Sequence, residues 1–134
     1  MDPTALGAPG TGKARKIGRR PLIDLAALQA AIAQGLLTQD GVWPATRRSR
    51  NSLEDYGWSY DDVLQILRCL LAEDYKESEW CDVDGGRTVP ADVYTIRYDE
   101  ARRQRHAGGL EFYLKFSVDE QGGLTLVLVQ NHLS

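Results

Sequence analysis

Tyr113 and Lys115 are the residues whose type and spacing point most directly to chemistry. They lie in the segment FYLKFSV, residues 112–118, in which apolar and polar residues alternate strictly. Such alternation predicts a β-strand with one face against a hydrophobic core and the other facing outward. A phenol and an ammonium group therefore lie side by side on the outward face of a predicted sheet.

More cationic and aromatic side chains gather near the same predicted sheet. Lys76 belongs to an earlier strand-like segment, YKESEWCDV, in which the alternation places it on one face with Ser78 and Trp80. A basic segment, RYDEARRQRH, connects two later strand-like segments. The basic residues of this connection and the tyrosines interleaved with them are Arg97, Arg102, Arg103, Arg105, His106, Tyr94 and Tyr98.

Lysine, arginine and tyrosine side chains, without a carboxylate cluster or metal ligands, suit metal-free cleavage of RNA. In that reaction the ribose 2′-hydroxyl attacks its own 3′-phosphate, so the protein supplies no nucleophile. It must accept one proton, donate another and stabilise charge on the phosphate oxygens. The alternative is that these residues form the solvated face of an antiparallel sheet. Neither reading predicts a metal site or a cofactor.

Three segments in the first half of the chain carry helix signals. DLAALQAAIAQG predicts a helix that Asp24 caps and Gly35 ends. TRRSRNSLEDYG predicts a more polar helix between Thr46 and Gly57, whose arginines are expected to face solvent. SYDDVLQILRCLLAEDY has the broadest apolar face and predicts the strongest helix, which Ser59 caps and which runs to about residue 75.

The hydrophobic period changes from helical to two after about residue 75. The segments that predict strands are 75–83, 90–98, 109–118 and 123–131. Short links rich in turn residues join them, which predicts an antiparallel meander. The expected fold is therefore α+β, with two or three N-terminal helices packed on one face of an antiparallel sheet of four or more strands.

The length of 134 residues predicts one domain with a single hydrophobic core. Residues 1–20 are rich in Gly, Pro and basic residues, which predicts a flexible tail before a domain over residues 21–134. The tail contains GAPGTGK, which fits a phosphate-binding loop. No strand precedes it, and Ala14 stands where Ser or Thr would hold magnesium, so we expect a chance match.

The net charge of −3 conceals an uneven distribution. Residues 1–20 carry five positive charges and one negative charge, so the rest of the chain carries −7. An acidic body argues against broad, non-specific nucleic-acid binding but allows a local basic site. No apolar run approaches a membrane span, and no signal peptide is evident. Cys69 and Cys81 fit no metal or disulfide framework, so we expect a cytoplasmic protein.

Several blocks of the sequence, in order, resemble those of the MqsR family. Its members are bacterial toxins of type II toxin–antitoxin systems, RNA interferases related in fold to RelE. The blocks are DYKES (74–78), TVPADVYTIR (88–97), FYLKFSV (112–118) and LTLVLVQNH (124–132), after two helical blocks beginning RPLIDL and TRRSR. The resemblance covers roughly residues 20–134. It implies a RelE-like fold, an endoribonuclease acting on mRNA without metal or cofactor, and a cognate antitoxin as partner.

The resemblance assigns roles residue by residue. The catalytic lysine of the family's F-Y-K-S block falls on Lys76, and the tyrosine of its Y-L-K strand falls on Tyr113, followed by Lys115. His132 is an approximate match to the basic residue that ends the family's last strand, and as a catalytic residue it would donate a proton. The residues expected to bind RNA are Arg97, Arg102, Arg103, Arg105 and Tyr94.

The sequence departs from the family pattern at positions that bear on activity. The glutamine of the family's W-Q-D-V-Y block is replaced by Ala91, and an acidic residue, Glu77, directly follows Lys76. Two hypotheses therefore stand. In the first, Lys76 and Lys115 stabilise the phosphorane while Tyr113 transfers a proton or orients the phosphate. In the second, the chain is a non-catalytic, divergent member that binds a protein or RNA partner.

Overall fold

The three α-helices begin at the caps that the sequence predicts. The computed structural model describes residues 15–132, with only the backbone of His132; the GAPGTGK segment lies outside this range. The Asp24 carboxylate accepts the Ala27 N–H at 3.0 Å, and Thr46 and Ser59 each cap a helix and form a capping box. The helices are α1 (Leu25–Ala33), α2 (Arg47–Tyr56) and α3 (Tyr60–Arg68).

The ends of the helices agree with the prediction for α2 and differ for α3. Gly57 ends α2 in the left-handed conformation, with φ of 67°. α3 stops at Arg68 instead of reaching residue 75, and a 3₁₀ turn, η4 (Ala72–Asp74), leads into the sheet. The Asp74 carboxylate accepts the Leu71 N–H at 2.7 Å. This local bond competes with continuation of the helix, so Leu71 is 44% exposed rather than part of the apolar face.

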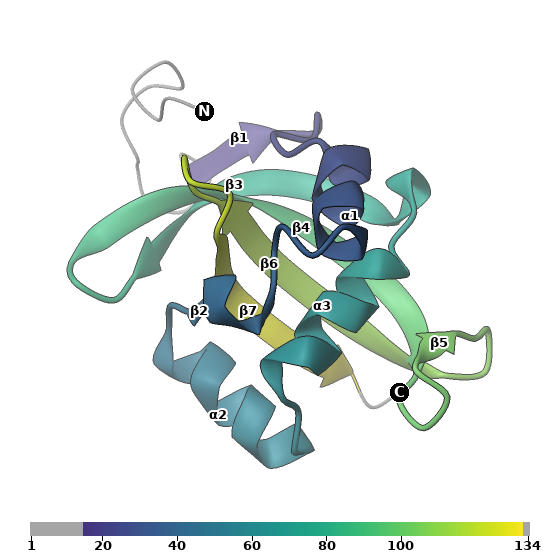
Figure 1. Cartoon of the computed structure of the whole chain (residues 1–134). Helices are drawn as coiled ribbons and strands as arrows, with labels where there is room; N and C mark the ends of the chain where they lie inside the picture. Colours follow the sequence, from purple (N-terminus) through teal and green to yellow (C-terminus); the bar gives the residue numbers. More distant parts are fainter. Residues whose placement is uncertain (1–14, 133–134) are drawn as a thin grey trace.

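Within residues 15–132, seven strands form one sheet (Figure 1). The hydrogen-bonded order is β1-β3-β4-β6-β7-β2, and β5 pairs with β4. The predicted antiparallel meander is confirmed as β3, β4, β6 and β7. The strands are β1 (Lys16–Gly18), β2 (Val42–Pro44), β3 (Tyr75–Val83), β4 (Arg87–Asp99), β5 (Gln104–Arg105), β6 (Leu110–Val118) and β7 (Leu124–His132).

Three short strands, β1, β2 and β5, were not expected from the sequence. β1 lies inside the segment predicted to be a flexible tail, and it pairs antiparallel with β3. The tail assignment is therefore wrong for residues 16–18. β2 follows a 3₁₀ turn, η3 (Gln39–Gly41), and pairs in parallel with β7, so the sheet is mixed rather than wholly antiparallel.

The helices pack on one face of the sheet and form the main core with it (Figure 1). α1 and α3 lie across the central strands, and α2 contacts β7 near the edge of the sheet. Aromatic rings of alternate sheet residues fill this core, with Tyr94 stacked on Phe116 and Trp58 of the α2–α3 link stacked on Phe112. No helix within the described residues has the length and apolarity needed to cross a membrane.

The opposite face of the sheet, which carries Glu79, Thr95, Tyr113 and Lys115, is called the helix-free face below. The strand alternation requires this placement, because the flanking residues of Tyr113 and Lys115 are buried in the main core. The sheet curls over at one end, where the Asp84 N–H donates to the Ala45 carbonyl at 2.8 Å. A smaller apolar cluster forms inside the curl from Ala45, Cys81, Val83, Ala91 and Val127.

Candidate functional site

Tyr113 lies at the centre of the helix-free face, on the central strand β6. Its cross-strand neighbours are Thr95 on β4 and Gln130 on β7. Lys115 follows two residues later on the same face, and its ammonium lies 5.7 Å from the centre of the Tyr113 ring. The structure thus brings together the phenol and the ammonium that the sequence predicted to be adjacent, at a distance suited to a cation–π contact.

Lys115 forms an ion pair with Glu79, a carboxylate that was not anticipated from the sequence. The Lys115 Nζ lies 2.5 Å from Glu79 Oε1, and Lys16 of β1 lies 3.3 Å from the other oxygen of the same carboxylate. Lys16 also pairs with Glu77. Two lysines and two glutamates therefore form one network with no net charge across strands β1, β3 and β6. Lys115, which was expected to stabilise the phosphorane, is thus paired with a carboxylate.

The pKa shifts of these groups follow from burial and ion pairing. Burial opposes ionisation of Glu79, but the hydrogen bonds and charges of Lys115 and Lys16 outweigh it and lower the Glu79 pKa. The hydrogen bond to Glu77 raises the Lys16 pKa. Burial raises the Tyr113 pKa, although Lys115 opposes this effect. Tyr113 therefore stays protonated at neutral pH, so its hydroxyl can donate a hydrogen bond.

Ala91 explains how Lys115 reaches Glu79. Glu79 of β3 pairs with Ala91 of β4, while Lys115 of β6 pairs with the next β4 residue on the same face, Val93. The ion pair therefore spans the intervening strand. Ala91 offers only a methyl group there and is fully buried. A glutamine at this position, as in the resembled family, would stand between the two charged groups.

Three cavities adjoin the neighbours of Tyr113 on this face. One of about 370 Å³ lies beside Lys115 and Glu79 and is also lined by Arg15 and Arg48. A second, of about 350 Å³, is lined by Gln130 and Arg48, whose Nη2 lies 3.2 Å from the Gln130 Oε1. The third, of about 470 Å³, begins at Thr95 and extends toward β5. The three cavities are therefore lined by neighbours of Tyr113, namely Lys115, Gln130 and Thr95, and two of them exceed 350 Å³.

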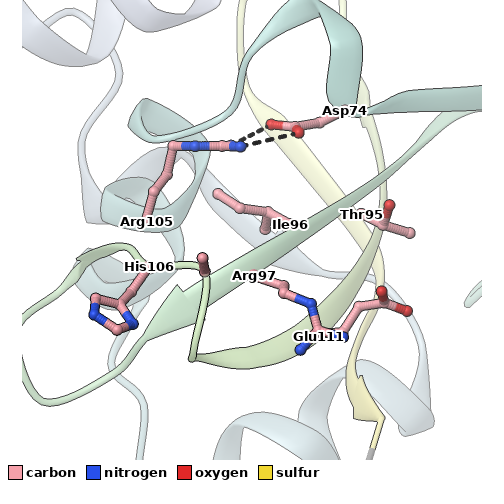
Figure 2. A pocket seen from close by; sticks show the side chains of 8 residues that line it. Asp74, Thr95, Ile96, Arg97, Arg105, His106 and Glu111 are labelled. Atoms are coloured by element: carbon pink, nitrogen blue, oxygen red, sulfur yellow. Dashed lines mark hydrogen bonds and ion pairs between the residues drawn. The ribbon is translucent and has the colours of Figure 1, made fainter.

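Arg97 projects into the third cavity, which is drawn in Figure 2. Its Nη1 donates to the Gly109 carbonyl at 3.1 Å, and its cross-strand neighbour is Glu111. His106 lies on the other side of Arg97, and its Nδ1 accepts the Gly108 N–H at 3.0 Å. Arg97 is exposed and lies on the same face as Tyr113, as the expected RNA-binding role requires.

The arginines of the 99–109 loop are held by carboxylates. Arg105 lies 2.6 Å from Asp74, and Arg103 lies 2.8 Å from Asp61 of α3. Arg102 is the least constrained, at 3.8 Å from Asp99. These ion pairs fix the loop to α3 and η4. Arg103 and Arg105 therefore stabilise the loop, and each would have to leave its carboxylate partner to bind a phosphate.

Lys76 and His132, two further predicted site residues, lie at or near the ends of their strands. Lys76 is exposed, at a register shift between Tyr75 and Glu77, and its ammonium makes no ion pair with a described residue. The shift separates Lys76 from Ser78, whose buried hydroxyl donates to Asp92 at 2.6 Å, so the prediction that these residues share a face is wrong. His132 pairs through its backbone with Glu111, and its side chain lies outside the described part.

Tyr94 is not on the helix-free face. Its side chain is 1% exposed and lies in the main core, between Tyr75 and Phe116. A buried ring has no surface to offer RNA, so the structure gives Tyr94 a packing role in place of the predicted RNA contact. Burial also raises the Tyr94 pKa to about 12.

The residues missed by sequence reasoning are Lys16, Arg48, Glu79, Thr95, Glu111 and Gln130. Thr95 and Gln130 had a usable signal, because they lie in phase with the outward residues of their strands. Lys16 and Arg48 had none, since their approach depends on how β1 and α2 dock.

The described residues include no group of three or more His, Cys, Asp or Glu side chains arranged to hold a metal ion. Comparisons with models of known protein families, with curated proteins and with solved structures returned no match for this chain.

Proposed function

We propose that this protein is the toxin of a type II toxin–antitoxin system and that it cleaves mRNA as a metal-independent endoribonuclease. One observation carries the proposal: a protonated tyrosine and a lysine lie together on the central strand of the helix-free face, and cavities are lined by Lys115 and by Thr95, the cross-strand neighbour of Tyr113. The resemblance of the blocks around Lys76 and Tyr113 to MqsR toxins supports the same activity. Under this proposal the fold is a divergent relative of RelE.

The proposed reaction needs three contributions from the protein. The substrate's 2′-oxygen attacks the phosphorus, and the bond from phosphorus to the 5′-oxygen breaks, leaving a 2′,3′-cyclic phosphate and a 5′-hydroxyl end. Lys115, released from Glu79, and Lys76 stabilise charge on the phosphate oxygens. Tyr113, which is protonated at neutral pH, either donates its proton to the departing 5′-oxygen or orients the phosphate through a hydrogen bond while solvent protonates that oxygen. In this proposal the Glu79 carboxylate, once it has released Lys115, accepts the 2′-hydroxyl proton.

The experiment is a cleavage assay on long single-stranded RNA in the presence of EDTA, with wild type and Tyr113→Phe. The substitution removes only the hydroxyl. We expect wild type to produce 2′,3′-cyclic phosphate ends and Tyr113→Phe to be slower by about 100-fold or more, the usual contribution of a proton-transferring group. In cells, expression of wild type should arrest growth and expression of Tyr113→Phe should not.

Tyr60→Phe is the matched control, because Tyr60 is an exposed tyrosine at the start of α3, away from the helix-free face. It should cleave as wild type does. RNA left intact by wild type, or equal cleavage by wild type and Tyr113→Phe, would contradict the proposal.

A second candidate function is binding of a protein or RNA partner without cleavage. It is favoured by the neutral network around Glu79, because Lys16 and Lys115 are both occupied by carboxylates. It is favoured also by the buried methyl of Ala91, where the resembled family has glutamine. Under this candidate, RNA stays intact in the assay and Tyr113→Phe leaves partner binding unchanged.

A further inference from the structure

The 470 Å³ cavity beside Tyr113 has the position of a subsite on the helix-free face. Thr95, which lines it, is the direct cross-strand neighbour of Tyr113, and Arg97 and Glu111 form the next pair along the same two strands in that phase. A group bound between Arg97 and Glu111 would therefore lie two residues along the strand from Tyr113, on the same face of the sheet. Its volume falls within the range of about 300–1,000 Å³ typical of small-molecule sites.

Asp74 and Arg105 in this cavity are paired with each other, which leaves Glu111 and part of the Arg97 guanidinium for a ligand. The Glu111 carboxylate makes no hydrogen bond or ion pair with another described residue, although Arg97 is its cross-strand neighbour. The Arg97 Nη1 donates a hydrogen bond to the Gly109 carbonyl. This bond orients the guanidinium, and its other N–H groups donate to no described residue. Figure 2 shows Arg97 and Glu111 adjacent, without a bond drawn between them.

We propose that this cavity binds an unpaired guanine base of RNA, with Glu111 and Arg97 reading its edge and His106 stacking on its face. The inference rests on the proposed function in taking RNA as the substrate. Guanine presents N7, O6, N1–H and N2–H₂ in a row along its edge. An arginine fork matches the two acceptors, and the two oxygens of a carboxylate match the two donors.

The other bases fit this pair of groups less well. Adenine and cytosine each offer an amino group but no second donor beside it, and uracil offers a single N–H between two carbonyl oxygens. A carboxylate with two unused oxygens therefore favours guanine. The exposed imidazole of His106, held by the Gly108 N–H, supplies a flat surface of the kind on which unpaired bases stack.

The test is a titration of ¹⁵N-labelled wild-type protein with each of the four nucleoside 3′-monophosphates, followed by NMR. We expect 3′-GMP to bind most tightly and to shift the amide signals of Thr95, Arg97 and Glu111. Glu111→Gln keeps the shape but loses one acceptor oxygen, so it should weaken 3′-GMP binding by about tenfold. Arg97→Lys, which loses the fork, should weaken it similarly, and Glu120→Gln in the β6–β7 turn should not.

The outcomes separate this inference from the proposed activity, since the titration needs no cleavage. Equal binding of all four nucleotides, no binding at millimolar concentration, or shifts confined to other surfaces would overturn the guanine site, even if the protein cleaves RNA. Binding of 3′-GMP in the cavity by a protein that leaves RNA intact would retain the guanine site and reject the cleavage proposal.

Discussion

Glu79 sets the charge of the candidate site. Its carboxylate contacts Lys115 and Lys16, so Lys115, which the sequence predicted to stabilise a phosphate, lies in a network without net charge. A phosphate that binds Lys115 must first replace this carboxylate. The exchange is feasible because a phosphate offers the lysine the same type of charge-assisted hydrogen bond.

The lowered pKa of Glu79 predicts a pH dependence of stability. Its ionised form is favoured by folding, so its contribution to the free energy of unfolding is present above the ordinary pKa of 4.5 and is lost as the pH falls through the lowered folded value. In Glu79→Gln this contribution is missing at every pH. Melting temperatures of the two proteins should therefore differ at pH 7 and converge below about pH 4.5.

Glu120→Gln removes the same charge from an exposed turn residue and serves as the control. Its melting temperature should follow that of wild type throughout. A difference between wild type and Glu79→Gln that stays constant down to pH 3 would rule out the ion-pair explanation.

At this scale, strand alternation was enough to place Tyr113 and Lys115 on the correct face. It failed for Lys76, because a register shift breaks the alternation and leaves no mark in the residue types. Tyr94 was expected to bind RNA only because it is a tyrosine near basic residues, and a tyrosine suits a core and a surface equally well. The partners of Arg103 and Arg105 come from α3 and η4, so only the assembled fold reveals them.

Thr46 joins α2 to the sheet and is the most informative residue at the scale of elements. Its hydroxyl accepts the Ser49 N–H at 3.0 Å and donates to the Val127 carbonyl of β7 at 2.6 Å. Thr46→Ala removes both bonds, so we expect the free energy of unfolding to fall by about 1–2 kcal/mol in urea denaturation.

Thr38→Ala provides the comparison, because Thr38 precedes η3 in the same kind of position but its side chain makes no cap bond. It should cost little stability. Equal losses from the two substitutions would show that the hydroxyl of Thr46 is not what anchors α2.

Helices and long strands were predictable because each carries its own local signal, either a cap or a repeating hydrophobic pattern. β1 and β2 have three residues each, too few for any pattern to repeat. Their strand conformation comes from pairing with β3 and β7 rather than from local preference. The end of α3 was overestimated for a related reason, since apolar residues continue beyond the point where Asp74 redirects the chain.

Across the whole molecule, Asp92 ties the chain before α1 to the sheet. Its buried carboxylate accepts the N–H groups of Leu22 and Ile23 at 3.0 Å, together with the Ser78 hydroxyl. Asp92→Asn replaces one accepting oxygen by an NH₂ group that faces these donors. We expect a loss of about 2–3 kcal/mol in the free energy of unfolding, measured by urea denaturation.

Asp55→Asn, an exposed substitution on α2, is the appropriate comparison and should leave stability almost unchanged. If Asp92→Asn were equally harmless, the buried hydrogen bonds would not be what secures this segment. The α+β class was predictable from the order of helices and strands, whereas this tie and the curl of the sheet depend on residues far apart in sequence.

The parallel pairing of β2 with β7 has a kinetic consequence. Val42 pairs with Leu124, so this contact closes a loop of about eighty residues, and contacts of such long range slow folding. The β3–β4 and β6–β7 hairpins need only short loops and are expected to form earlier. Docking of β2 and the start of α2 onto β7 is thus expected to be a late step of refolding. Arg48 reaches Gln130 only through this docking, so the neighbourhood of Tyr113 is completed last.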